Sequence, residues 1–138
     1  AITIQPVVKI HPDLKVRFAI AQQAARAEGF EIRIASGYRT LARQGYLYAK
    51  AIKKYGSPIA AARWVAPPDI SHHPMGLALD VNLPDGKTGA KWLEENGYKF
   101  GLCRVFKNEW WHFEAPIAPG DKCPAMMKDA TELLHSRA

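Results

Sequence analysis

Two short segments with histidine and carboxylate side chains constrain this 138-residue chain more than any other feature of its sequence. The first is SHHPMGLALD, at residues 71–80, and the second is EWWH, at residues 109–112. Together they supply two imidazoles and a carboxylate, the donor set of a hydrolytic zinc site that keeps one position open. A closed structural zinc site favours cysteines, and the chain has only two, neither in a CxxC pair. We therefore expect a fold that brings the two segments together around a metal.

The first segment is expected to be a loop followed by a strand. Pro74 and Gly76 disfavour a helix, so His73 should lie in a loop. A short apolar strand is predicted at residues 77–81, with Asp80 near its end.

The second segment runs into a predicted strand at residues 111–114, where aromatic residues alternate with polar ones. Alternation places His112 and Glu114 on one face of that strand. Glu109, three residues before His112, reaches that face only from the turn before the strand or from a bulge.

A third segment, SGYRT at residues 36–40 with Gln44 after it, completes a pattern. The motifs SGYRT, SxHxxGxAxD and ExxH, in this order, resemble zinc D-Ala-D-Ala carboxypeptidases and dipeptidases of the VanY and VanX type, peptidase family M15. That group is related to phage L-alanyl-D-glutamate endolysins and to the Hedgehog N-terminal domain. The resemblance runs from about residue 32 to residue 114 and implies the same α+β fold, a small, mostly antiparallel sheet flanked by helices.

The resemblance also implies a role for each motif residue. His73, Asp80 and His112 correspond to the zinc ligands, Glu109 to the general base, and Arg39 to a group that stabilises negative charge on the reacting carbonyl.

Four other polar residues lie in or near the motifs. Ser71 and Gln44 are predicted to bind substrate, with packing near the site as the alternative for Gln44. The motif spacing selects His73 as the ligand, which leaves His72 as a neighbour in the cleft or a surface residue. Glu114 is either a hydrogen-bond partner of a ligand histidine or an ordinary carboxylate at the end of a strand.

The activity implied by the resemblance is that of a zinc metallopeptidase of bacterial peptidoglycan. We expect a D-alanyl-D-alanine carboxypeptidase that hydrolyses the terminal peptide bond of the stem peptide, in the cell envelope or periplasm or as a secreted protein. One alternative is an endopeptidase that cuts at L-Ala-D-Glu or at a cross-link, as in a phage lysin. Another is a zinc-stabilised binding module without turnover. The chain lacks the GxSxG, SxxK and P-loop motifs of rival catalytic classes.

Composition narrows the choice of partners and location. The net charge is +6, but the basic residues are scattered and no nucleic-acid-binding motif is present, so we do not expect a nucleic-acid partner. Attraction to an anionic cell wall suits the charge equally well. No apolar run approaches the roughly 20 residues that span a bilayer. The sequence begins at Ala1 without a signal peptide, so we expect either a removed leader or a trimmed chain. A monomer is the default expectation.

The length predicts a single domain over residues 1–138. Cys103 and Cys123 are expected to form a disulfide around the second motif, with two free thiols as the alternative. The first half of the chain is predicted to contain an extended lead-in at 1–9, a helix from Pro12 to just before Gly29, a strand at 31–35 and a helix capped by Thr40 and closed by Gly56. A helical turn is predicted at 60–64. After the strand that carries Asp80, we expect a short helix capped by Thr88 and ended by Gly97, a hairpin of strands 102–106 and 110–114, and a final helix at 124–134.

Overall fold

The central element is a small antiparallel sheet. The computed structural model describes residues 9–135, so the predicted lead-in lies outside the described residues except for Lys9. Four strands, β1 (Ile34–Ser36), β2 (Ala78–Val81), β3 (Cys103–Arg104) and β4 (His112–Glu114), are arranged in the order β1-β2-β4-β3, and all three pairings are antiparallel. With helices on either side, this confirms the predicted α+β class.

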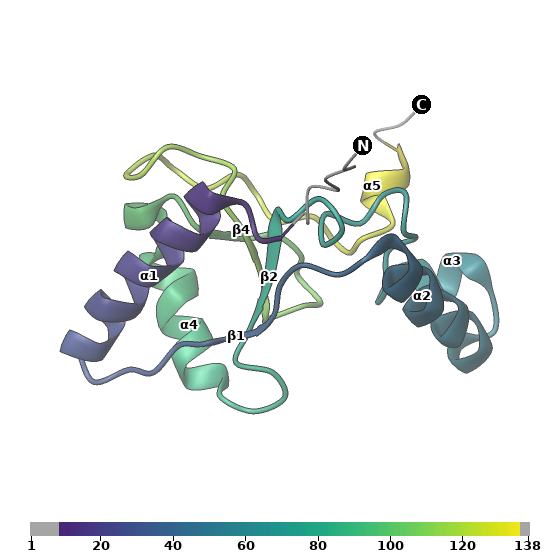
Figure 1. Cartoon of the computed structure of the whole chain (residues 1–138), viewed down its shortest axis with the longest axis horizontal. Coiled ribbons are helices and arrows are strands. Elements are labelled where there is room, and N and C mark those ends of the chain that lie inside the picture. Colours follow the sequence, from purple (N-terminus) through teal and green to yellow (C-terminus); the bar gives the residue numbers. More distant parts are fainter. Residues whose placement is uncertain (1–8, 136–138) are drawn as a thin grey trace, which may run out of the picture.

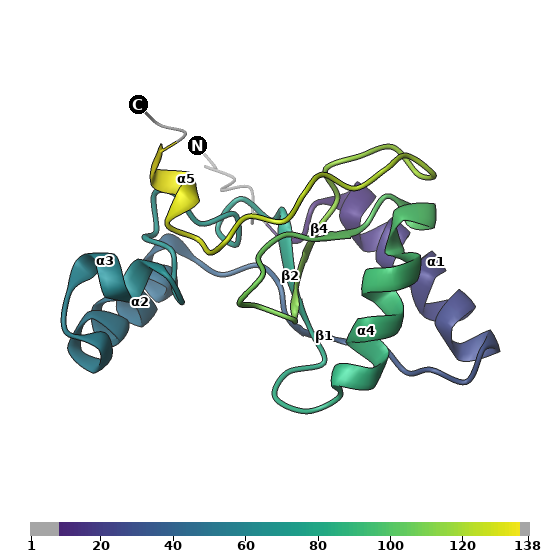
Figure 2. The same ribbon diagram turned by 180° about the vertical axis from the view of Figure 1, so that it is seen from behind.

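Helices flank the sheet in two groups (Figures 1 and 2). On one side lie α1 (Pro12–Ala27), α4 (Lys87–Asn96) and the 3-10 helix η1 (Gly97–Phe100) that continues α4. On the other side lie α2 (Leu41–Tyr55) and α3 (Pro58–Ala62), near the short α5 (Glu132–His135). None of the helices within residues 9–135 has the length and apolar character needed to cross a membrane.

The hydrophobic core lies between the sheet and the α1–α4 pair. It consists of buried apolar side chains from α1, β2, α4, β4 and the segments between them, and its large members include Leu14, Phe18, Ile32, Leu79, Trp92, Leu93, Leu102 and Phe113. Each polar site residue on β2 or β4 therefore has neighbours along the strand that are anchored in this core. The sheet is held rigidly on one side, and its polar side chains face the other group of helices.

Two predicted helix ends are confirmed by the backbone. The Thr40 hydroxyl accepts a hydrogen bond from the Arg43 amide at 3.0 Å and caps α2, and Gly56 ends α2 in the left-handed conformation. This cap places Arg39 immediately before the first turn of α2, beside the end of β1.

Two other predictions were wrong. Thr88 does not cap α4, because the helix begins at Lys87 after Gly86, and no side chain among the described residues caps that end. The final helix covers Glu132–His135 rather than 124–134. The cause is backbone pairing: Met127 donates to Val105 and accepts from Lys107, and these bonds to another segment preclude a helical turn there.

Several strands are shorter than predicted, although the predicted hairpin pairing is confirmed. The strand expected at 31–35 begins at Ile34, because the carbonyls of Glu31 and Ile32 accept hydrogen bonds from the side chains of Asn82 and Gln22. The predicted hairpin forms between β3 and β4, but its paired part is limited to four residues and residues 105–111 make up its loop.

Gly76 of the first motif is required by a close approach of two chain segments. Its φ is +73°, and a Cβ at this position would collide with the carbonyl oxygen of Lys9. The His11 amide also donates to the Gly76 carbonyl at 2.8 Å, so the segment before α1 is fixed against the loop that carries His73.

We expect Gly76→Ala to destabilise the protein by more than the roughly 1–3 kcal/mol of backbone strain alone, because it adds a backbone collision. Gly56→Ala is the matched control, since Gly56 also has a positive φ but no described atom lies within 4 Å of the position that its Cβ would take. Urea unfolding measures both free energies. Equal destabilisation by the two substitutions would contradict the importance of the Lys9 contact.

Candidate metal centre and active site

Two neighbouring strands bring the two motifs together. In the pairing of β2 with β4, Asp80 lies directly opposite His112, while His73 approaches from the loop before β2. One donor atom from each of these three buried residues lies within 4.8 Å of the other two. Directly opposite residues of antiparallel strands have close Cβ atoms, which explains why residues 32 apart in sequence share one site.

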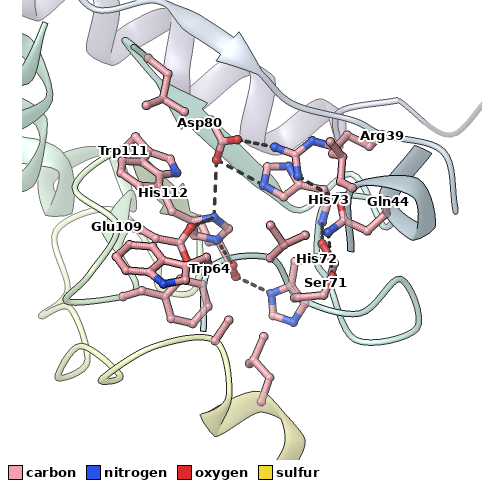
Figure 3. A pocket seen from close by; sticks show the side chains of 18 residues that line it. Arg39, Gln44, Trp64, Ser71, His72, His73, Asp80, Glu109, Trp111 and His112 are labelled. Atoms are coloured by element: carbon pink, nitrogen blue, oxygen red, sulfur yellow. Dashed lines mark hydrogen bonds and ion pairs between the residues drawn. The ribbon is translucent and has the colours of Figure 1, made fainter. Parts of the chain in front are cut away.

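The donor atoms have the arrangement expected of metal ligands. Asp80 Oδ1 lies 3.3 Å from His73 Nε2 and 3.6 Å from His112 Nδ1 (Figure 3). This buried oxygen has no hydrogen-bond partner among the described residues. An unsatisfied buried carboxylate oxygen is costly, and a cation between it and two imidazole nitrogens would remove the penalty. The three residues therefore fit a zinc ion.

The remaining ring nitrogens of both histidines are engaged elsewhere. His73 Nδ1 donates to the Gly37 carbonyl at 2.7 Å, which leaves the Nε2 lone pair for the metal site. His112 Nε2 lies 2.7 Å from Glu114 Oε2. The opposite nitrogen of each ring therefore faces the metal site.

Arg39 holds Asp80, the carboxylate among the three candidate ligands. Its guanidinium donates to Asp80 Oδ2 at 2.5 Å, to Gln44 Oε1 at 3.0 Å and to the Ser36 hydroxyl at 3.2 Å. Gln44 is almost fully buried and donates in turn to the Ala66 carbonyl at 2.8 Å. Both ends of the Gln44 amide are thus engaged within the protein, and the glutamine supports Arg39 as Arg39 supports Asp80.

Glu109 lies in the loop before β4, as its spacing from His112 required. Its amide donates to the Phe106 carbonyl in a turn, and its Oε1 lies 3.8 Å from His112 Nδ1. Burial raises the pKa of Glu109 to about 7. A carboxylate with this pKa beside a metal site is suited to accept and release a proton near neutral pH.

His72 and Glu114 also join the site. The Glu114 carboxylate bridges the two rings, with Oε1 2.7 Å from His72 Nδ1 and Oε2 bound to His112. Two roles were open for Glu114, a hydrogen-bond partner of a ligand histidine or an ordinary carboxylate at a strand end. The structure shows the first, because Glu114 contacts the His112 ring. The role of His72 had no signal in the motif spacing, because its contact is with a residue 42 positions away.

Charge interactions shift the protonation of this cluster. Burial alone would lower the pKa of His112, but the Asp80 and Glu114 carboxylates outweigh it and raise that pKa to about 10. Burial would raise the pKa of Glu114, but its bonds to His112 and His72 lower it to about 2. Burial would raise the pKa of Asp80, but His112 and His73, together with the Arg39 guanidinium, hold it well below its usual range.

The three candidate ligands and Glu109 line a cavity of about 230 Å³. Ser71 lines it as well, and its hydroxyl accepts a hydrogen bond from the His73 amide at 3.2 Å. Sequence reasoning missed the apolar part of the lining, which comes from segments without motifs: Leu47, Trp64, Val65, Phe106, Ala130 and Leu133. The polar end of the cavity suits a peptide group, and the apolar part suits small aliphatic side chains.

A disulfide joins Cys103 on β3 to Cys123. It encloses the loop that carries Glu109 and the strand that carries His112 in one covalent ring. The segment after Cys123 continues to Met127, which pairs with that loop, and to Ala130 and Leu133 in the cavity wall.

Comparisons with known proteins agree with this geometry. The sequence model of the family VanY, D-alanyl-D-alanine carboxypeptidase, matches residues 7–114. A D-alanyl-D-alanine carboxypeptidase of Enterococcus faecalis (strain ATCC 700802 / V583) is 34% identical across 77% of this chain and 46% of its own length. The chain thus spans about half the length of that relative.

Solved structures of VanY proteins are similar as well. One is a vancomycin-resistance D,D-pentapeptidase VanY from a VanB-type cassette in complex with Zn(II), with a TM-score of 0.71, 29% identity and coverage of 83% of this chain and 78% of that one. Another is VanYB in complex with D-alanine-D-alanine, with a TM-score of 0.71, 30% identity and coverage of 77% and 71%. The chain belongs to the VanY family of D-alanyl-D-alanine carboxypeptidases.

Proposed function

We propose that this protein is a zinc-dependent carboxypeptidase that removes the terminal D-alanine from peptidoglycan stem peptides. The observation that carries the proposal is the buried Asp80 Oδ1, which has no hydrogen-bond partner within residues 9–135 and faces His73 Nε2 and His112 Nδ1 beside the Glu109 carboxylate. The VanY relatives support zinc as the metal and D-Ala-D-Ala as the ligand class, because their structures contain them.

His73, Asp80 and His112 would hold the zinc ion. When bound, zinc supplies a Lewis acid for the scissile carbonyl and a water molecule of lowered pKa. Two nitrogen donors and one oxygen donor leave a coordination position open for this chemistry, as hydrolytic sites require.

Glu109 is proposed as the general base. In its ionised form it accepts the proton of the attacking water and then delivers that proton to the leaving amine of D-alanine. Its buried position in the cavity wall keeps the pKa near 7, so the same group can act in both steps at neutral pH.

Arg39 is proposed to stabilise negative charge on the reacting carbonyl, as well as to hold Asp80. Three of the five guanidinium N–H donors bind described residues, and the two that remain, one on each terminal nitrogen, are available to substrate. Ser71 is proposed to donate its hydroxyl proton to substrate, because its oxygen already accepts from the His73 amide. We assign Gln44 a supporting role through Arg39, since its own amide is engaged within the protein.

We propose that the protein is located in the bacterial cell envelope, in the periplasm or outside the cell. The disulfide supports this, because disulfides persist in oxidising compartments. The net charge of +6 favours association with an anionic cell wall.

Mass spectrometry of the products tests the activity. After incubation of the zinc-loaded protein with a muropeptide ending in D-Ala-D-Ala, we expect the loss of one alanine, blocked by a chelator and restored by zinc. An internal cut would instead assign the protein to the endopeptidases. No cleavage with zinc confirmed in place would favour a binding module.

Replacing Glu109 by Gln should lower kcat by about 10²–10⁴-fold, the usual contribution of a general base, while the zinc content stays at the wild-type level. Glu95→Gln is the matched control, because Glu95 is an exposed carboxylate on α4, and its kcat should be unchanged. Steady-state kinetics with metal analysis checks both. A Glu109→Gln enzyme with full turnover would remove this residue from the mechanism.

Zinc binding should release at least about one proton at pH 7. His112, with its pKa raised to about 10, is protonated in the metal-free protein but must be neutral to bind the metal. Zinc affinity should therefore rise by about tenfold per pH unit between pH 7 and 9. Titration calorimetry in buffers of different ionisation enthalpy measures the release, and a heat independent of the buffer would contradict it.

A further inference from the structure

The Glu114 carboxylate is shared by two histidines that serve the metal site in different ways. His112 is a proposed ligand, and its Nε2 is 2.7 Å from one Glu114 oxygen. His72 directly precedes the ligand His73, and its Nδ1 is 2.7 Å from the other oxygen. We propose that Glu114, supported by His72, is a positioning residue that fixes the His112 ring in the tautomer and orientation that present Nδ1 to zinc.

The tautomer follows from the hydrogen-bonding capacity of the groups. An ionised carboxylate only accepts hydrogen bonds, so each ring nitrogen that faces Glu114 must carry a proton. A proton on His112 Nε2 leaves, in the neutral ring, a lone pair on Nδ1. That is the atom that lies 3.6 Å from the partnerless oxygen of Asp80.

His73 provides an internal comparison. Its Nδ1 donates to the Gly37 carbonyl, so Nε2 is its free donor atom. The two proposed ligands are thus held in opposite tautomers by two different acceptors, a backbone carbonyl and a carboxylate. A wrong tautomer of either ring would aim an N–H group at the metal, so the acceptor behind each ring contributes to the zinc affinity of the site.

The backbone makes this support rigid. His112 and Glu114 lie on one face of β4, and Phe113 between them is fully buried in the core. Pairing with β2 and β3 on both sides leaves β4 little freedom to move the carboxylate away from the ring.

His72 completes the support at the rim of the site. Its side chain is 30% exposed, and it lies between the cavity that contains the metal site and a second cavity bounded by His11 and Asp13 at the start of α1. Figure 3 shows the His72 ring at the edge of the site opposite Asp80. By binding the outer oxygen, His72 restricts the rotation of a carboxylate that would otherwise be free to turn toward solvent.

The test compares zinc affinities by competition with a chromophoric chelator. The inference rests on the proposed zinc site, so wild-type binding is measured first. We expect Glu114→Ala to weaken zinc binding by about 10–100-fold, the usual loss when the partner of a ligand histidine is removed. His72→Phe should cause a smaller loss, because Glu114 itself remains. Glu114→Gln keeps the volume but offers only one acceptor oxygen to two N–H groups, and its affinity should fall between wild type and Glu114→Ala.

Nitrogen-15 NMR of the zinc-loaded protein gives a readout that a purely structural role would not change. We expect wild-type His112 to carry its proton on Nε2 and to bind zinc through Nδ1, and Glu114→Ala to lose or broaden the Nε2–H signal. Glu109→Gln is the matched control, because it removes another buried carboxylate near the His112 ring. Among the described residues, Glu109 makes no hydrogen bond to a histidine, so this substitution should preserve the tautomer of His112.

Thermal melting followed by circular dichroism establishes that each variant is folded. If wild type binds zinc and folded Glu114→Ala and Glu114→Gln bind it within twofold of wild type, the positioning role is overturned while the zinc site stands. If wild-type His112 binds zinc through Nε2, the role is likewise overturned. If wild type does not bind zinc, the proposed metal site fails and this inference fails with it.

Discussion

The pairing of β2 with β4 is the constraint on which the site depends. It sets Asp80 opposite His112, and it does so because Leu79 and Phe113, the buried neighbours of these residues, pair in the same register. A shift of one residue would turn Phe113 out of the core and Glu114 or His112 into it. The hydrophobic core therefore selects the register, and the register assembles the ligands.

Part of the placement of the site residues could be predicted from local sequence patterns, whereas the roles proposed for them came from the resemblance to VanY- and VanX-type peptidases. The alternation at 111–114 placed His112 and Glu114 on one face, and the distance of Glu109 from His112 required the turn in which it lies. Thr40 and Gly56 framed α2 through hydrogen bonds within a few residues of each position. Such features can be predicted because the interactions that cause them join residues only a few positions apart.

The parts that could not be predicted depend on contacts between distant segments. The segment 124–131 had helical composition, but its backbone is used by Val105 and Lys107. The start of β1 is delayed by side chains from α1 and from the residue after β2. Two features of the site also depend on contacts between distant segments: the contact of His72 with Glu114 and the apolar cavity wall around Leu133. No spacing rule in the sequence connects the residues that form them.

The disulfide limits the effect of proteolytic cleavage in one exposed stretch of the chain. Residues 118–122 are exposed and lie inside the ring closed by Cys103 and Cys123. A protease that cuts there leaves the chain in one covalent piece, with Glu109 and His112 still joined to the N-terminal motifs and with Ala130 and Leu133 still held by Cys123. One cut in that stretch would therefore not separate the two sides of the cavity from each other.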